Sequence, residues 1–571
     1  MEVIILLVIL YLAFLYIVIR GAMENKKQRQ KYRQYLKDLF GKFSDRKMYT
    51  EDVENLSRTT INEEEFLVDD ITWNDLSMDR IFEQMNFTQS SSGEEYLYKM
   101  LKKPVLNNKN DLDKMNRHIE YLMKNEEERI EIMTKLHSLN RSGKYTLKDY
   151  MDYLETLGNR NNLKHYVANI LIIASFALIF INTSLGVVLL IGTVCYNMAT
   201  YFGEKGKVAP YVSTFAYIMR LVNQTDEILK LQYSCKSNKE EDSGINDYLN
   251  TLKEKRASLK GLETNSKMVL KIGVSNGSME ELLFDYIKMI THIDLIKFNS
   301  MFKQVKERSN EIFDLSEKIG YIDAVISIGY YRAALPYYCT PQLSEGNDIA
   351  FEIEDGYHPL ITSPVPNSFS QSKGMLITGS NASGKSTFLK MVAINSILAQ
   401  TIYTCAAKKY SANYYRTYSS MALRDDLSNG ESYYIVEIKA LKRILDAVPN
   451  SDTPLLCFVD EVLRGTNTVE RIAASAQILK CLAQKNVQCF AATHDIELTH
   501  LLEGIYNNYH FEEDVKNGDI IFSYHLMDGR AHTRNAIKLL EIIGFSKDII
   551  SSADNMAADF LNSGEWNSKF L

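Results

Sequence analysis

Glycine, lysine and serine stand near position 380 at a spacing that can hold phosphate groups. Residues 379–386 read GSNASGKS, which fits the pattern G-x-x-x-x-G-K-[ST] in full. The glycines let backbone N–H groups close around an anion, Lys385 supplies positive charge, and the Ser386 hydroxyl can ligate Mg²⁺. The apolar run 375–378 predicts a strand before this loop, and 387–400 predicts a helix after it. The residues expected to contact the phosphates are Gly379, Ser380, Asn381, Ala382, Ser383, Gly384, Lys385, Ser386 and Thr387.

Two further predicted strands end in groups that nucleotide hydrolysis can use. The apolar run 455–459 leads directly into Asp460 and Glu461, which is the Walker B arrangement. Asp460 is expected to hold Mg²⁺ through water, and Glu461 to orient or deprotonate the attacking water. A third run, 489–493, ends at His494, whose imidazole can sense or stabilise charge on a transferring phosphoryl group. Together with the phosphate loop, these residues predict an ATPase that uses ATP and Mg²⁺.

Composition and cysteine spacing narrow the class of protein. The net charge of -7 argues against a surface built throughout for nucleic acid, although a local basic face is not excluded. The seven cysteines are scattered and none forms a C-x-x-C pair. The sequence therefore suggests neither a zinc site nor a disulfide framework.

The hydrophobic pattern changes near residue 349. Before that point the spacing is mostly helical, for example over 112–136, and only 9 prolines occur in 571 residues. After it, short apolar runs alternate with helical stretches, which indicates a mostly parallel sheet covered by helices. The expected fold class is therefore α plus α/β.

The N-terminal stretch 3–19 is uncharged and almost wholly apolar. Ten Lys or Arg residues against three acidic residues follow between Arg20 and Lys47, so the positive-inside rule places the chain after this stretch in the cytoplasm. The sequence begins Met1-Glu2 rather than with a basic segment, which favours an uncleaved anchor over a cleaved signal peptide. The basic cluster can also lie on anionic lipid head groups.

A second uncharged stretch covers 166–203 and is interrupted by Asn182-Thr183-Ser184. Lys164 precedes it, and Lys205 and Lys207 follow it, so a helical hairpin with both ends in the cytoplasm fits the charges. The alternative is a hairpin buried in a soluble protein. Because both halves are apolar all round rather than along one stripe, we expect a transmembrane hairpin.

Five motifs follow one another after residue 350. They are GYHPL (356–360), TGSNASGKST (378–387), DDLSNGESYYIVE (425–437), VDEVLRGTN (459–467) and ATHDIELTHL (492–501). In order and spacing they resemble the ATPase domain of the MutS family of DNA mismatch repair proteins. The run 528–550 looks like the helix-turn-helix end that closes MutS dimers, and 87–104 looks like the start of the MutS core domain.

This resemblance implies roles for residues that spacing alone does not assign. In MutS and ABC ATPases the signature segment approaches the γ-phosphate bound by the other subunit, so Asn429, Gly430 and Ser432 are expected to act in trans in a homodimer. Tyr524 lies where the family often has an aromatic side chain that stacks on adenine. Departures from the family pattern occur at Ser380, Ser383, Glu431 and Asn467, and none of them removes a ligand.

The sequence therefore predicts a MutS-like protein that lacks the mismatch-reading domain. The expected segments are a transmembrane anchor (1–20), a basic juxtamembrane segment (21–62), a MutS-like helical core (63–165), a transmembrane hairpin (166–203), a helical lever (204–345) and the ATPase domain with C-terminal dimerisation helices (346–571). We expect a multi-pass protein of the cell membrane with a cytoplasmic ATPase domain. Its function would be a dimeric ATP-driven switch linked to mismatched or structured DNA. The alternative is a DNA-independent mechanochemical ATPase that acts on a membrane or protein partner.

Overall fold

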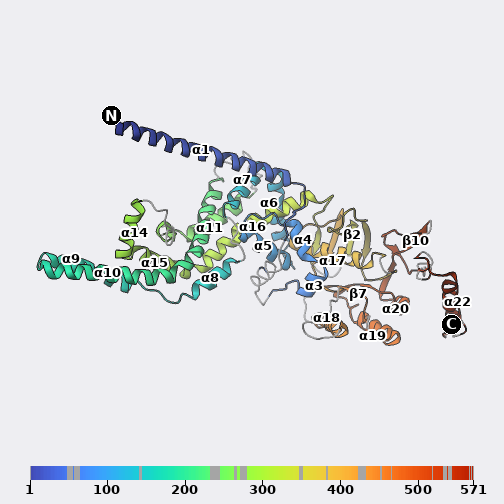
Figure 1. The fold of residues 1–571 in the computed structure, drawn as a ribbon. Coiled ribbons are helices and arrows are strands. Elements are labelled where there is room, and N and C mark those ends of the chain that lie inside the picture. Colours follow the sequence, from blue (N-terminus) through green and yellow to red (C-terminus); the bar gives the residue numbers. More distant parts are fainter. Residues whose placement is uncertain are drawn as a thin grey trace. The chain divides into compact units, whose positions relative to one another are not determined.

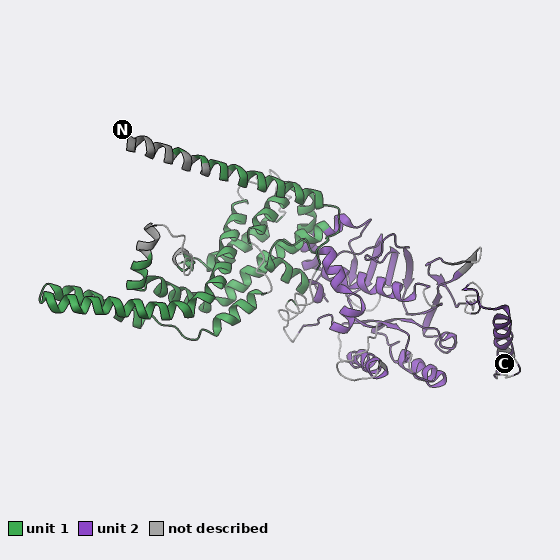
Figure 2. Cartoon of the chain, viewed as in Figure 1, with its two compact units in different colours: residues 1–61, 86–99, 117–330 green, residues 62–85, 100–116, 331–571 purple. Residues whose placement is uncertain are grey.

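The computed structural model divides the chain into two compact units (Figure 2). Unit 1 comprises 1–61, 86–99 and 117–330, and unit 2 comprises 62–85, 100–116 and 331–571. The structure describes all residues except 1, 48–55, 57–64, 140–144, 232–244, 263–265, 271–278, 346–350, 381–382, 422–432, 450–452, 464–465, 517–518, 532–536, 538–539, 541–542, 565, 567–568 and 570–571.

Unit 1 is built from helices, as predicted (Figure 1). The predicted helical stretch 112–136 forms two helices, because Asn125 leaves helical geometry at φ -98° and ψ 77°. α5, α6 and α16 have residues in both units. The helices are α1 (Glu2–Leu39), α5 (Ser91–Lys102), α6 (Lys109–Lys124), α7 (Glu126–His137), α8 (Leu147–Glu155), α9 (Leu163–Ile179), α10 (Thr183–Val208), η1 (Ala209–Tyr211), α11 (Val212–Leu231), α12 (Asn246–Ser258), α13 (Ser266–Val269), α14 (Met279–Thr291), α15 (Ile293–Glu307) and α16 (Ser309–Ala334).

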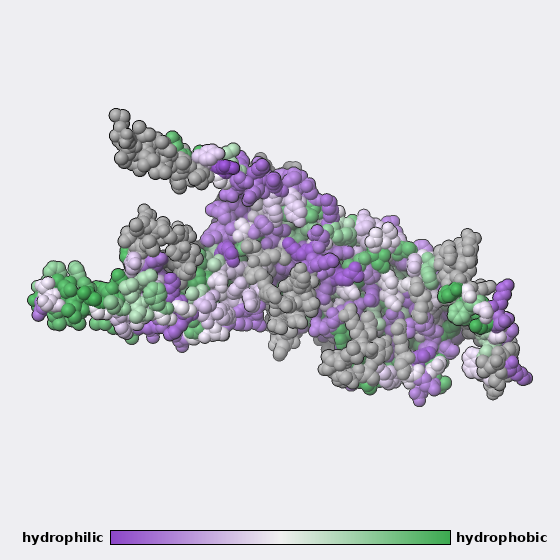
Figure 3. Space-filling view, viewed as in Figure 1, coloured by the Kyte–Doolittle hydropathy of each residue, from purple (hydrophilic) through white to green (hydrophobic). Residues whose placement is uncertain are grey.

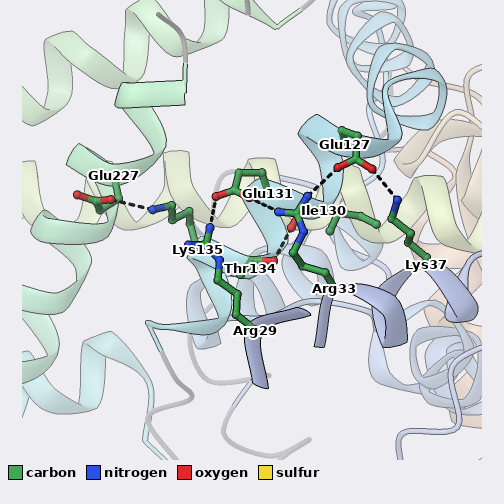
Figure 4. A network of polar contacts seen from close by, with 9 residues as sticks. All are labelled: Arg29, Arg33, Lys37, Glu127, Ile130, Glu131, Thr134, Lys135 and Glu227. Carbon is green, nitrogen blue, oxygen red and sulfur yellow. Dashed lines mark hydrogen bonds and ion pairs between the residues drawn. The ribbon is translucent and has the colours of Figure 1, made fainter. Parts of the chain in front are cut away.

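The basic half of α1 lies along the acidic face of α7 (Figure 4). Arg29 and Arg33 both pair with Glu131, and Arg33 also reaches Glu127 at 2.7 Å. Lys37 pairs with Glu127 as well. These three cations of the segment predicted to be juxtamembrane thus have acidic partners within the protein. The contact of the basic cluster with lipid head groups stays a prediction.

The predicted hairpin is present as the helix pair α9–α10. By length and composition, one helical stretch in the described part of the chain could cross a membrane, Thr183–Leu231, with a mean hydropathy of 1.6. The partner helix Leu163–Ile179 is apolar but shorter. The structure therefore supports the hairpin without supporting a two-pass crossing. Most side chains of 3–19 lie outside the described residues, so the anchor at that end stays a prediction.

Unit 2 contains the predicted parallel sheet. Its strand order is β12-β9-β4-β8-β7-β6, and all pairs are parallel except β12 with β9. Fully buried strands such as β7 and β8 explain why the sequence runs there are continuously apolar. These strands are β4 (Gly374–Thr378), β6 (Arg416–Ser420), β7 (Leu455–Asp460), β8 (Val487–Ala492), β9 (Tyr506–His510) and β12 (Met527–Asp528).

A second sheet with the order β1-β5-β2-β3 was not predicted, because its short strands alternate polar with apolar residues. An aromatic cluster joins it to the parallel sheet: Phe351 and Phe369 contact Phe490 of β8, and Phe369 also contacts Phe388 of the helix α17 (Lys385–Thr401). The strands of this sheet are β1 (Gln342–Ser344), β2 (Phe351–Gly356), β3 (Asn367–Gln371) and β5 (Lys409–Asn413). A separate hairpin pairs β10 (Glu513–Lys516) with β11 (Asp519–Phe522).

The C-terminal end of α17 is fixed by a buried arginine. Arg332, in the last turn of α16, is 1% exposed. It donates to the Thr404 hydroxyl at 2.7 Å and to the Tyr403 carbonyl at 2.9 Å, just after α17 ends. It also donates to the Asn116 side-chain oxygen at 2.7 Å and to the Ile402 carbonyl at 3.4 Å. Backbone carbonyls just after α17 thus receive hydrogen-bond donors that the helix itself does not supply.

Residues 65–85 pack within unit 2, although the sequence analysis assigned them to the helical core. Asp75, at the end of α3 (Asp70–Asp75), accepts hydrogen bonds from the Ser419 hydroxyl (2.6 Å) and the Met421 N–H (2.9 Å). These bonds cover the edge strand β6, whose outer backbone groups need partners. The remaining helices of unit 2 are α4 (Met78–Met85), α18 (Tyr433–Ala447), α19 (Thr468–Cys481), α20 (Ile496–Leu501) and α22 (Lys547–Ser563).

The ion pairs between α1 and α7 predict a measurable coupling. In a double-mutant cycle of Arg33→Ala and Glu131→Ala, we expect a coupling free energy of about 1 kcal/mol in urea unfolding, because both side chains are partly buried. The exposed pair Lys442–Asp446 is the matched control, and its coupling free energy should be only about 0.3 kcal/mol. Equal coupling in the two pairs would contradict a specific α1–α7 contact.

Candidate functional site

Three strands of the parallel sheet end side by side. In the register of the sheet, Ala492 of β8 lies opposite both Ile377 of β4 and Asp460 of β7. Because the strands run in the same direction, the residues after each strand meet at the same edge. The phosphate loop, Glu461 and His494 follow β4, β7 and β8, so this edge brings together the predicted phosphate loop and the two predicted catalytic residues.

Two glycines shape the loop between β4 and α17. Gly379 has φ 146° and Gly384 has φ 109°, values that residues with a side chain rarely adopt. A Cβ at Gly379 would lie 2.9 Å from the Phe511 carbonyl oxygen, and one at Gly384 would lie 3.2 Å from the ring of Tyr524. Gly384 is also the N-cap residue of α17, so the loop ends at the positive end of a buried helix. The predicted phosphate contacts Asn381 and Ala382 lie outside the described residues.

Lys385 lies at the centre of the loop. Its side chain is buried, and its ammonium donates to the carbonyl oxygens of Gly379 (2.8 Å) and Ser380 (2.9 Å). The same nitrogen lies 3.4 Å from Nε2 of His494. The charge that could neutralise a phosphate is thus held by its own loop and lies close to the end of β8.

Glu461 and His494 come together although the sequence places them on separate strands. The carboxylate Oε1 of Glu461 lies 2.8 Å from Nε2 of His494. Glu461 has φ 57°, and its N–H donates to the carbonyl of Ala492 at 2.9 Å. This turn directs the chain immediately after β7 toward β8. A carboxylate with a fixed imidazole neighbour can orient a water molecule and accept its proton.

A cavity of about 530 Å³ opens above the loop. Ser380, Gly384, Lys385, Ser386 and Thr387 line it, together with Glu461 and Tyr524. Ser383, within the loop, is buried, and Asp460 is buried at the end of β7. The hydroxyl and the carboxylate expected to hold Mg²⁺ follow β4 and end β7, the two strands that flank β8. Both offer the oxygen ligands that this cation prefers.

Tyr524 stands at the wall of this cavity with 44% of its surface exposed. Its ring stacks on Phe522 with centroids 5.9 Å apart. The side chain of Asn367 holds the segment by donating to the Tyr524 carbonyl (3.0 Å) and accepting from the Leu526 N–H (2.7 Å). An exposed, supported aromatic ring beside a phosphate loop can stack on a flat base.

Sequence reasoning missed several side chains around the cavity. Asn367 holds the loop of Tyr524, and Glu513 accepts a hydrogen bond from the Ser380 hydroxyl. His358 lines the cavity, and its burial, with the nearby cations Lys390 and Arg80, lowers the pKa of its imidazole to about 4. Only His358 lay in a quoted motif. The other two are brought in by strand pairing and carry no local pattern.

A fourth residue, Glu437, supports the segment after Glu461. It is 1% exposed and accepts a hydrogen bond from the Leu463 N–H. Glu437 ends the quoted run 425–437, so that motif marked it without assigning a role. The predicted trans-signature residues Asn429, Gly430 and Ser432 lie outside the described residues.

The geometry of Gly384 yields a prediction for the loop. Gly384→Ala should weaken ATP binding about fivefold or more, because a left-handed backbone costs a residue with a Cβ about 1–2 kcal/mol. Titration with a fluorescent ATP analogue measures this effect. Gly504→Ala is the matched control, since a Cβ there meets nothing within 4 Å. An unchanged affinity for the Gly384 variant would show that the loop does not need this conformation.

Comparison with known proteins agrees with this geometry. Residues 375–561 match MutS domain V. The DNA mismatch repair protein MutS of Thermotoga maritima is 30% identical over 291 residues, which cover 48% of this chain and 35% of that protein. The protein of the same name from Leptospira interrogans is 31% identical over 297 residues, covering 49% and 34%.

A third relative, MutS of Lactobacillus delbrueckii subsp. bulgaricus, is 27% identical over 290 residues, covering 48% of this chain and 33% of the relative. The chain thus spans about a third of the length of the curated relatives that it matches. The matched region contains the phosphate loop and both strand ends of the candidate site. Residues 375–561 are thus similar to MutS domain V, and about half of the chain is similar to curated MutS proteins.

Proposed function

We propose that the protein is an ATPase whose hydrolysis cycle switches a homodimer between two states. The observation that carries this proposal is that Lys385, Glu461 and His494 lie together at one sheet edge. Nε2 of His494 lies 3.4 Å from Nζ of Lys385 and 2.8 Å from Oε1 of Glu461. A phosphate loop supplies binding, and the carboxylate–imidazole pair supplies a means to activate water. The similarity of residues 375–561 to MutS domain V supports the same activity.

The chain's own residues divide the chemistry among them. Lys385 would exchange the carbonyl oxygens of its loop for phosphate oxygens, while loop N–H groups and the N-terminus of α17 hold the same anion. Ser386 and Asp460 would hold Mg²⁺, which neutralises charge on the phosphates when bound. Glu461 would orient the attacking water and take its proton, with His494 fixing the carboxylate. Tyr524 would stack on adenine.

Dimerisation and the signature segment belong to the same proposal. Asn429, Gly430 and Ser432 would complete the site of the partner subunit, so that ATP binding closes two ATPase domains on each other. The helix α22 and the preceding run 528–546 would contribute to the dimer contact. Relatives named DNA mismatch repair protein MutS support a link to structured or mismatched DNA.

A membrane location is the second part of the proposal. The anchor at 3–19 and the apolar hairpin α9–α10 support it. The hairpin is also the observation that favours the second candidate function, a DNA-independent ATPase that acts on a membrane or protein partner. Both candidates place the ATPase domain in the cytoplasm, and they differ in what stimulates turnover.

The role of Glu461 can be tested by a single substitution. Glu461→Gln should lower the rate of ATP hydrolysis about 100-fold or more while ATP binding is retained, because the amide cannot accept the proton of water. Light scattering during gel filtration should show an ATP-dependent dimer that persists in this variant. Glu497→Gln, in the first turn of α20, is the control and should hydrolyse ATP normally. Hydrolysis at the original rate in Glu461→Gln would refute the assignment.

The link to DNA can be tested with the detergent-solubilised protein. ATP hydrolysis should rise severalfold with mismatched or branched duplexes, and this stimulation should fall steeply as salt increases, since phosphate contacts release counterions. Perfect duplex, single strands and lipid are the comparisons. A rate that no DNA changes, but that lipid raises, would replace the DNA-linked function by the DNA-independent one. The Glu461→Gln variant shows the background.

A further inference from the structure

The buried positions of the α9–α10 hairpin are mostly small or polar, apart from Tyr201 and Val208 near its base. Ala168 and Ser175 are buried on α9, and Gly186 and Asn197 are buried on α10. A Cβ on Gly186 would lie 2.5 Å from the backbone nitrogen of Ile179, so only glycine allows this approach. Membrane helices associate through small residues in this way, whereas helices in water bury their large apolar side chains.

The large apolar side chains of the hairpin point outward (Figure 3). In the most apolar window of Thr183–Leu231, only 17% of the residues are buried. Exposure on this scale at the surface of a protein in water is unfavourable and marks a contact surface. Exposed apolar side chains on both helices and at the tip include Ile170 (63%), Ile173 (68%), Phe176 (56%), Phe180 (80%), Ile181 (84%) and Val188 (67%).

Several donor groups along the hairpin are paired within the protein. Hydroxyl groups donate to backbone carbonyls one turn earlier in the chain, as from Ser175 to Leu171 (2.7 Å) and from Thr200 to Tyr196 (3.0 Å). At the base, the Asn197 amide donates to the Ile290 carbonyl at 3.0 Å. Donors that are paired inside the protein can enter hydrocarbon at little cost.

A charged collar surrounds the base of the hairpin, formed by Arg160, Lys164, Glu204, Lys205 and Lys207. No Asp, Glu, Lys or Arg lies between Lys164 and Glu204 in the sequence. Glu204 contacts Arg160 at 2.6 Å, Lys164 at 2.8 Å and Lys207 at 3.1 Å. Burial acts to raise the pKa of Glu204, but the hydrogen bonds from these cations hold it at about 2. The collar thus keeps a net positive charge directly beneath the apolar surface.

We propose that the hairpin embeds in a lipid bilayer and that the cationic collar binds the anionic phospholipid head groups around it. The 17 residues of α9 extend about 26 Å from the collar, close to the ~30 Å of a hydrocarbon core. A second copy of the chain fits less well, because the apolar surface runs round both helices and two parallel hairpins would bring their cationic collars together. This inference rests on the proposed membrane location and is independent of ATP hydrolysis.

A fluorophore at the hairpin tip tests this inference in the full chain. Ile181→Cys is labelled with an environment-sensitive dye, with Cys195, Cys235 and Cys481 replaced by serine, and the protein is reconstituted with phosphatidylcholine vesicles with or without phosphatidylglycerol. Spin-labelled lipid should quench the dye severalfold more than aqueous iodide does, and more strongly when phosphatidylglycerol is present. Val469→Cys, which is 77% exposed in unit 2, is the matched control and should show the reverse.

Charge substitutions separate the two parts of the proposal. Ile173→Glu with Val188→Glu should abolish lipid quenching at the tip, whereas Val469→Glu should not change quenching at Ile181→Cys. Lys164→Glu with Lys207→Glu should remove the preference for phosphatidylglycerol. Circular dichroism and the rate of ATP hydrolysis show whether each variant is folded.

Three results would overturn the inference. The first is a tip that stays accessible to iodide on vesicle-bound protein, which would leave the N-terminal anchor as the membrane contact. The second is a tip shielded without lipid in a concentration-dependent way, which would assign the surface to a second copy. The third is equal quenching with neutral and anionic vesicles, which would remove the role of the collar. None of these results bears on ATP hydrolysis, which the same samples report separately.

Discussion

Parallel pairing of β4, β8 and β7 is the constraint on which the candidate site depends. Strands that run in one direction leave their carboxyl ends at one edge, and the register fixes which residues become neighbours there. Lys385, Glu461 and His494 are far apart in the sequence, and the strand pairing brings them together. A shift of one residue in either pairing would turn the side chains of the shifted strand to the opposite face. Burial of β7 and β8 on both faces makes such a shift costly.

The α9–α10 hairpin of unit 1 distributes its apolar side chains in the opposite way to unit 2. In unit 2 the largest apolar side chains fill the interior, as Phe351, Phe369 and Phe490 do. In the α9–α10 hairpin they lie outside, and small residues such as Ala168 and Gly186 lie inside. One chain thus follows two rules of packing, and the change between them occurs at the collar, where charge becomes abundant again.

Local sequence patterns predicted the individual strands, the helix and the loop of the candidate site. The strands β4, β7 and β8, the helix α17 and the position of the phosphate loop were all marked by apolar runs and motif spacing. Contacts between distant segments left no such signal. Examples are the pairing of Arg33 with Glu131, the hydrogen bond from Ser380 to Glu513 and the packing of Asp75 against β6. Each depends on which surfaces meet, and periodicity does not encode that.

The same distinction explains why the phosphate loop was predicted while its mechanical support was not. α17 begins at the loop with Lys385 and ends at Thr401, about 26 Å away. Just beyond that end, Arg332 of α16 holds the carbonyl of Tyr403 and the hydroxyl of Thr404. Because α17 is almost wholly buried and helices resist compression, a movement of the loop along the helix axis must either strain these bonds or displace the last turn of α16. Arg332 thus ties the last turn of α16 to the segment that follows α17 within unit 2.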